Sequence, residues 1–248
     1  MSVIYLVRHG QASFGAGDYD KLSAVGVRQS ELLGEILRDR VPKPDLVVSG
    51  SLERHRDTAA GALDTLGLDL TPEVDPRWDE YDHRDIVVRH KPAYRSRLWM
   101  KLDLALRGSP GKAFQAMFDE ALLRWVAADS GYTESWAVFS ERACAALADL
   151  ADGLEPSQTA VVFTSGGPIS AITANLLVTG PRGGSDDDTT AGNGAGPDLS
   201  TVGPHLWLNL NRVMINTGIT KIVTGRRGAT LVSFNDHSHL DGELLTYR

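Results

Sequence analysis

The sequence has one cysteine, and it lacks any apolar run of about 18 residues, the length typical of a membrane-spanning helix. A single cysteine excludes an internal disulfide, and Cys144 lies among alanines, as in a packed helix rather than a reactive site. No cluster of cysteine and histidine has zinc-ligand spacing, so we expect neither a metal nor another cofactor. Nor does a signal-peptide pattern precede the first apolar run, which predicts a cytoplasmic protein without a membrane partner.

Positive charge is also scarce. Lys and Arg number 25 against 32 Asp and Glu, which gives a net charge of −7. This balance argues against nucleic acid or an anionic membrane surface as a partner. The 248 residues are 42% hydrophobic, enough for the core of one large domain. We therefore expect a single domain over residues 1–248, and the sequence leaves homo-oligomerisation open.

Apolar runs typical of buried strands alternate with helical patterns along the chain. Strands are expected at residues 3–7, 45–48 and 160–164, with a hairpin formed by 212–225 and 229–234. Helices are expected at 26–39 and 51–66, with two more between 85 and 128 that break at 107–111. A further helix is expected to start at Ser135 or Thr133 and to reach about residue 151. Such alternation predicts an α/β fold with three layers, α/β/α, and a mostly parallel central sheet with an antiparallel edge.

Residues 181–204 differ from the rest because they are rich in Gly, Asp, Ser and Thr and almost free of large apolar side chains. Such a segment cannot bury enough surface to offset its ordering entropy, so we predict a flexible insertion within the domain. Asp186, Asp187 and Asp188 could bind a divalent cation, but no other ligand converges on them in the sequence. We interpret them as a solvated acidic loop.

The first strand ends at Arg8-His9-Gly10, the most informative feature of the chain. Ligands of open α/β sheets bind at the carboxyl ends of the strands, and Gly10 allows a sharp turn there. The forked guanidinium of Arg8 suits an anion, and the imidazole of His9 can attack it. The alternative is an ordinary charged loop after an edge strand.

Other strand ends also carry polar groups. Arg54 lies in the first turn of the helix that Ser51 is expected to cap. Residues 78–83 form an acidic, aromatic loop. The strand at 160–164 leads into Ser165, and the N–H groups of Gly166 and Gly167 then open a helix, where an anion site is expected.

Taken in order, these segments resemble the histidine phosphatase superfamily, which has the phosphoglycerate mutase-like fold. The matching segments are Leu6-Val7-Arg8-His9-Gly10-Gln11, Leu22-Ser23 with Gly26 and Gln29, Ser51-Leu52-Glu53-Arg54 with Thr58-Ala59, Trp78-Asp79-Glu80-Tyr81, and Phe234-Asn235-Asp236 with His239-Leu240. The resemblance implies that His9 is a nucleophile that becomes phosphorylated and that Arg8 and Arg54 grip the phosphoryl oxygens. It also implies that Glu80 protonates the leaving oxygen, with Asp79 and Asp82 as competitors for that role, and that residues 84–133 form a helical cap.

One position departs from the family pattern. The family has a second histidine where this chain has Ser165. A serine can donate a hydrogen bond to a phosphoryl oxygen but brings no positive charge, so we expect slower turnover and expect Ser165→His to raise it. The phosphate-binding set implied is Arg8, Arg54, Ser165 and Gly166. By sequence alone, His205 and His237 are the candidates for a substitute imidazole.

The resemblance implies a metal-independent phosphatase that cleaves a small phosphorylated substrate through a phosphohistidine. A phosphoglycerate mutase-type phosphotransferase is a second candidate, but residues 11–21 lack the Asn and Trp associated with those mutases. A phosphate-binding or interaction module with weak turnover is the third, because of Ser165. The basic segment 84–107 is either an anion-attracting rim or an ordinary solvated helix face.

Overall fold

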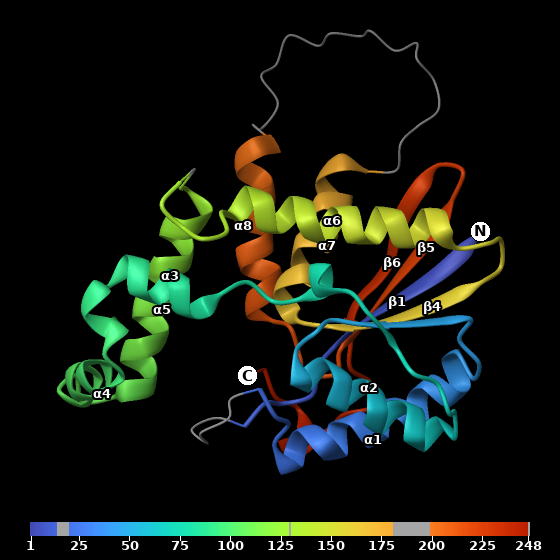
Figure 1. The fold of residues 1–248 in the computed structure, drawn as a ribbon, viewed down its shortest axis with the longest axis horizontal. Coiled ribbons are helices and arrows are strands. Elements are labelled where there is room, and N and C mark those ends of the chain that lie inside the picture. Colours follow the sequence, from blue (N-terminus) through green and yellow to red (C-terminus); the bar gives the residue numbers. More distant parts are fainter. Residues whose placement is uncertain (14–19, 129, 181–198, 248) are drawn as a thin grey trace, which may run out of the picture. The chain divides into compact units, whose positions relative to one another are not determined.

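The computed structural model describes residues 1–13, 20–128, 130–180 and 199–247 (Figure 1). Contacts between Cα atoms divide the chain into two compact units. The first unit consists of Met1–Glu80 and Ala143–Arg248, and the second is Tyr81–Arg142. The helical cap expected at residues 84–133 falls within the second unit.

A six-stranded sheet, counted over the described residues, forms the centre of the first unit. Its strands are β1 (Ser2–Arg8), β2 (Leu46–Ser49), β3 (Glu73–Val74), β4 (Thr159–Thr164), β5 (Ile219–Gly225) and β6 (Gly228–Asp236), in the order β3-β2-β4-β1-β5-β6. The strands β3, β2, β4 and β1 pair in parallel, whereas β5 and β6 add an antiparallel edge. The expected mostly parallel sheet with an antiparallel edge is confirmed.

Helices cover both faces of this sheet (Figure 1). On one face lie α1 (Ala24–Arg40) and α2 (Glu53–Leu66), and on the other lie α7 (Gly166–Thr179) and α8 (Leu199–Arg212). Alternate strand residues point to opposite faces, and those toward α1 and α2 pack into one buried cluster that includes Tyr5, Val7, Phe163, Leu33 and Ala59. The three-layer architecture is therefore confirmed. The helix α6 (Trp136–Gly153) begins in the second unit and ends in the first.

The second unit contains more helices than the sequence predicted. Three α-helices, α3 (His83–His90), α4 (Arg97–Ala105) and α5 (Pro110–Val126), occupy the stretch in which we expected two. The extra break lies at Pro92, which lacks a backbone N–H and starts the short 3-10 helix η2 (Pro92–Arg95). Trp125 is fully buried in this unit, and its indole N–H donates to the Glu134 carbonyl at 2.8 Å.

Three other expectations need correction. The helix α2 begins after Leu52, whose side chain makes no capping hydrogen bond, and the Ser51 hydroxyl binds Asp79 instead of the helix. The hairpin starts at Ile219, since residues 199–212 form α8. Residues 181–198, with the three adjacent aspartates, lie outside the described residues, but residues 199–204 are helical rather than part of a flexible insertion. Trp207, fully buried, anchors α8 through an indole hydrogen bond to the Gly167 carbonyl.

Among the described residues, no helix combines the length and the apolar character that crossing a bilayer requires. The remaining short elements are the 3-10 helices η1 (Pro76–Trp78) and η3 (Gly242–Leu244).

Candidate active site

The register of the parallel strands brings the candidate residues to one edge of the sheet. Arg8 pairs with Thr164, and the His9 N–H donates to the Thr164 carbonyl at 2.8 Å. On the other side of β4, the Gly50 N–H donates to the Phe163 carbonyl at 3.0 Å. The residues that follow β1, β4 and β2 are therefore neighbours, at the carboxyl ends where α/β sheets bind ligands.

The two ring nitrogens of His9 have different partners. Nδ1 lies 2.6 Å from the Gly10 carbonyl oxygen, which can only accept, so Nδ1 carries the proton. Nε2 accepts a hydrogen bond from Nε–H of Arg54 at 3.2 Å. Burial lowers the pKa of His9 well below its usual value, and the charges of Arg54 and Arg8 and the ring of His55 lower it further. His9 is thus a neutral imidazole whose lone pair on Nε2 faces a guanidinium.

Two arginines are fixed around this ring by different partners. Arg54 is 7% exposed, and its Nη1 pairs with Oδ1 of Asp20 at 2.6 Å. Nη1 of Arg8 donates to the Met214 carbonyl and, at 2.7 Å, to the Tyr247 carbonyl. Planar guanidinium groups held in fixed orientations suit the recognition of phosphoryl oxygens.

A strained loop before β5 holds the backbone of His9. Asn216 donates from Nδ2 to the His9 carbonyl at 3.1 Å, and the Thr217 N–H lies 3.3 Å from the same oxygen. Thr217 has a φ of 57°, which a β-branched residue adopts only under strain, and its hydroxyl lies 3.0 Å from Nε2 of His239. Asn235 braces the loop by accepting from the Ile215 N–H at 2.9 Å. Sequence analysis did not identify Asn216 or Thr217, because nothing local marks this role.

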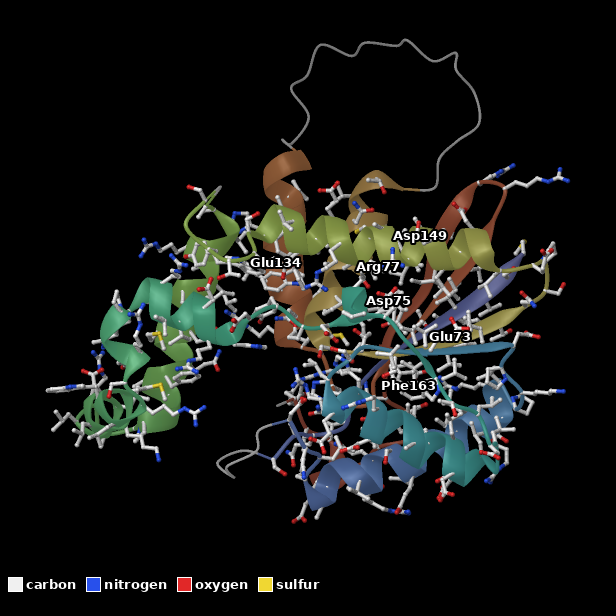
Figure 2. The ribbon with its side chains drawn as sticks, viewed as in Figure 1. Glu73, Asp75, Arg77, Glu134, Asp149 and Phe163 are labelled. Carbon is white, nitrogen blue, oxygen red and sulfur yellow. The ribbon has the colours of Figure 1, made fainter. Side chains whose placement is uncertain are left out.

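The acidic loop after β3 is fastened to the rest of the first unit. Arg77 binds Asp75 at 2.8 Å and Asp149 of α6 at 2.5 Å, and Figure 2 shows it between the two carboxylates. The next residue, Trp78, is buried, and its carbonyl accepts from the Thr164 hydroxyl at 2.5 Å. Asp79 and Glu80 therefore follow a segment that is fixed to both β4 and α6.

The three candidate acids have three different environments. Asp79 accepts from the N–H and the hydroxyl of Ser51, at 2.6 and 2.5 Å. Asp82 caps the N-terminus of α3. Glu80 accepts from the Gly167 N–H at 3.2 Å, at the start of α7. Glu80 therefore contacts the N-terminus of the helix that follows β4.

The histidine that the structure places beside Ser165 is His55, which sequence analysis missed. Its Nε2 lies 2.7 Å from the Ser165 hydroxyl oxygen, and its ring centroid is 5.6 Å from that of His9. His55 is fully buried, and this burial, aided by the charge of Arg54, lowers its pKa well below the usual value. The one available signal was its position directly after Arg54.

The two histidines proposed from sequence have other surroundings. His205 is exposed on α8, and Nδ1 of His237 lies 2.8 Å from the Asn235 carbonyl. Neither forms a hydrogen bond with Ser165 in the part of the chain that the structure describes.

The glycines of the site act through close approach. A Cβ on Gly10 would lie 2.6 Å from the Gly26 carbonyl oxygen, so the position requires glycine for space rather than for the sharp turn we predicted. A Cβ on Gly166 would lie 3.5 Å from Nε of Arg8, so this backbone runs beside the Arg8 guanidinium. The N–H of Gly167, expected to be an open anion site, donates to Glu80.

Metal ligands and surface charge complete the description. Within residues 1–13, 20–128, 130–180 and 199–247, no three His, Cys, Asp or Glu side chains are placed to hold a metal ion. Part of the basic charge of residues 84–107 is neutralised within the second unit, since Arg89 pairs with Asp85, and Lys91 and Arg107 both pair with Asp103.

Comparison of the sequence with protein families gives a match over residues 4–188 to the model described as the histidine phosphatase superfamily (branch 1). No curated protein is similar enough in sequence to match this chain.

Solved structures share the fold at low sequence identity. A mutant phosphoserine phosphatase from Entamoeba histolytica, in complex with phosphoserine, is 17% identical with a TM-score of 0.60, covering 97% of this chain and 100% of that one. A mycobacterial glucosyl-3-phosphoglycerate phosphatase in complex with VO3 is 21% identical, with a TM-score of 0.58 and coverage of 95% and 99%. A putative alpha-ribazole-5'-P phosphatase from Escherichia coli is 18% identical, with a TM-score of 0.59 and coverage of 95% and 98%.

Proposed function

Because the chain belongs to the histidine phosphatase superfamily (branch 1), we propose that it is a metal-independent phosphomonoesterase that forms a phosphohistidine on His9. The observation that carries the proposal is the contact between Arg54 and His9. Arg54 donates to Nε2 of His9. A phosphoryl group that approaches the nucleophilic nitrogen would therefore also meet the guanidinium that is proposed to bind its oxygens. A neutral ring with its proton on Nδ1 need not lose a proton before it attacks, but the Arg54 N–H must first turn from Nε2 to a phosphoryl oxygen.

The reaction has two in-line steps. In the first, Nε2 of His9 forms a bond to phosphorus while the bond from phosphorus to the ester oxygen breaks. The leaving oxygen takes a proton from the carboxyl group of Glu80, which is worth about 10²–10⁴-fold for an alkoxide. In the second, Glu80 removes a proton from water, the oxygen attacks phosphorus, and the bond to Nε2 breaks to release inorganic phosphate.

Positioning and charge supply most of the catalysis in phosphoryl transfer. Arg8 and Arg54 hold the phosphoryl oxygens with planar forks, and Ser165 and the Gly166 N–H add neutral donors. In the free protein Glu80 contacts the Gly167 N–H at 3.2 Å. This contact holds the carboxyl group at the start of α7, next to Ser165 and Gly166, and supports its proposed role as the acid.

The names of proteins of similar fold support a proposal for the substrate class. Two of these carry names for the dephosphorylation of phosphoserine and of glucosyl-3-phosphoglycerate, both small phosphomonoesters with further polar groups. We propose that this chain also acts on a small phosphorylated metabolite. Phosphate release from a panel of such compounds would identify it.

Labelling with an alkaline quench, in which a phosphohistidine survives, tests the proposal directly. The protein is mixed with a ³²P-labelled aryl phosphate and quenched, and the label is mapped by peptide analysis. We expect acid-labile, base-stable label on His9, lost in His9→Ala, and release of inorganic phosphate by the wild type. Transfer of the label to a second metabolite instead of water would indicate a mutase, and tight phosphate binding without label would indicate a binding module.

A further inference from the structure

The phosphoryl-binding group at the end of β4 is a neutral hydroxyl with an imidazole behind it. Ser165 and His55 are both fully buried, and 2.7 Å separates the serine Oγ from Nε2 of His55. His55 and Ser165 are 110 residues apart in the sequence, so the tertiary fold brings them together. Ser165 occupies the position at which family resemblance implies a histidine, which makes the imidazole behind it a candidate replacement.

Gly50 leaves the space that the imidazole of His55 occupies. A Cβ on Gly50 would lie 2.3 Å from Nδ1 of His55 and 2.7 Å from Oδ1 of Asp79. Only a glycine therefore allows the imidazole and the carboxylate to occupy their present positions. Asp79 is itself fixed by the two hydrogen bonds from Ser51, at 2.6 and 2.5 Å.

The partners of the two ring nitrogens indicate where the proton lies. Nδ1 of His55 has no hydrogen-bond partner within the described part of the chain, and the Asp79 carboxylate lies 3.7 Å from it. Nε2 has a close partner in the Ser165 oxygen. A neutral ring with its proton on Nε2 donates to Ser165, and the serine hydroxyl is then free to donate onward. A second proton on Nδ1 would face a carboxylate.

We propose that His55 is a positioning residue that acts through Ser165: it orients the serine hydroxyl toward a phosphoryl oxygen and takes up a proton from solvent, on the side of Asp79, when a phosphoryl dianion binds. The inference rests on the proposed function. The resulting line of donors runs from His55 through Ser165 to the phosphoryl group, and the Asp79 carboxylate faces the other ring nitrogen of His55 as an acceptor. Through Ser165, the protonated His55 supplies the positive charge that an imidazole in direct contact with the phosphoryl group would supply.

The charges around His55 explain why the ring takes up a proton only when a phosphoryl dianion is bound. Burial and the charge of Arg54 on its own helix disfavour a proton on the ring, and the N-terminus of α7 lies beyond Ser165. Asp79 is the opposing charge. A bound dianion adds two negative charges close to the ring, which favours the protonated form.

A double-mutant cycle tests the coupling. His55→Gln can hold the hydrogen bond but cannot carry charge, and Ser165→Ala breaks the line at the next residue. We expect each to lower kcat on an aryl phosphate by about 10–100-fold, somewhat less than the loss of a direct oxyanion donor, with little change in KM. We expect His55→Gln/Ser165→Ala to be no worse than either single variant, because the two residues act as one unit.

Proton uptake gives a second measurement that a merely structural role would not change. Inorganic phosphate is titrated into the wild type and His55→Gln near pH 6, in buffers of different ionisation enthalpy. Since the ionisation of phosphate itself is the same in both, the difference between the two reports the ring. We expect the wild type to take up more protons than His55→Gln, by up to about one. His205→Gln, which changes an exposed histidine on α8, is the matched control and should behave as the wild type.

The outcomes separate the two proposals. Label on His9 together with additive losses in the cycle, or with equal proton uptake in the wild type and His55→Gln, would overturn the role of His55 and leave the phosphatase intact. Absence of label on His9, or label on Ser165, would overturn both. If His55→Gln fails to fold, Ser165→Ala replaces it in the uptake experiment, with the same expected loss.

Discussion

The carboxylate of Asp20 binds the guanidinium of Arg54, with 2.6 Å between Oδ1 and Nη1. The other carboxylate oxygen accepts the Glu53 N–H at 2.7 Å, in the first turn of α2. Asp20 therefore fixes both the start of the helix and the side chain that it presents to His9. This pair fixes the orientation in which the Arg54 guanidinium faces His9.

Replacing Asp20 by Asn removes the charge from this pair while retaining an acceptor for the Glu53 N–H. We expect kcat/KM to fall about 10-fold, because Arg54 loses its fixed orientation, while Tm changes little. Steady-state kinetics and thermal unfolding measure the two effects. Lys21→Gln, which removes the exposed neighbouring pair with Glu53, is the control and should be close to the wild type. An Asp20→Asn enzyme with wild-type kcat/KM would contradict this role.

Glu80→Gln should affect substrates according to their leaving group. An alkoxide needs a proton as it departs, whereas a nitrophenolate does not, so we expect a loss of about 10²–10⁴-fold in kcat for alkyl phosphates and a much smaller loss for para-nitrophenyl phosphate. Asp82→Asn, which alters the cap of α3, should change both substrates equally. Equal losses on the two substrates in Glu80→Gln would remove Glu80 from the role of acid.

Gly50→Ala tests whether the space beside His55 matters. The new methyl group would lie 2.3 Å from Nδ1 of His55 and 2.7 Å from Oδ1 of Asp79, so one of these side chains must move. We expect at least a 10-fold lower kcat, with the overall fold kept as judged by circular dichroism. Gly153→Ala, at a position with open space around it, should leave kcat unchanged. A fully active Gly50→Ala protein would show that this packing is dispensable.

The free energy of unfolding should decrease as the pH falls below about 6.5. Burial lowers the pKa of His9 and of His55 well below 6.5, and that of His239 to about 4. The unfolded chain binds these protons at a higher pH than the folded chain, so the stabilisation is fully present above pH 6.5 and is lost as the pH falls toward the folded-state values. For His239 alone we expect a loss of about 1–2 kcal/mol at pH 5.

Urea unfolding at pH 7.5 and pH 5 measures this change, with His239→Gln expected to show a smaller difference between the two pH values. An equal unfolding free energy at both would contradict the neutral, buried state of these rings.

Short-range patterns predicted the sheet and the strand ends. The apolar run of β1 and its abrupt end at Arg8 depend on neighbouring residues alone, and parallel strands must place such ends together. The structure brings His9 and Arg54 into contact as a consequence. Patterns among neighbouring residues in the sequence therefore predict well which residues lie at the end of a strand.

Contacts between distant segments were not predictable in the same way. Asn216 holds the His9 carbonyl across 207 residues of sequence, and no pattern around it indicates this. His55 reaches Ser165 because the buried face of α2 lies toward β4. The sequence around Arg54 does not define the position of that face to within one residue. The expected cap by Ser51 failed for a similar reason, since its hydroxyl binds a distant carboxylate.

The second unit has a genetic consequence. The chain enters it once, after Glu80, and leaves it once, at Arg142. A single in-frame exchange between these two points, the second of which lies within α6, would therefore leave the codons for β1, β2, β4 and His9 unaltered.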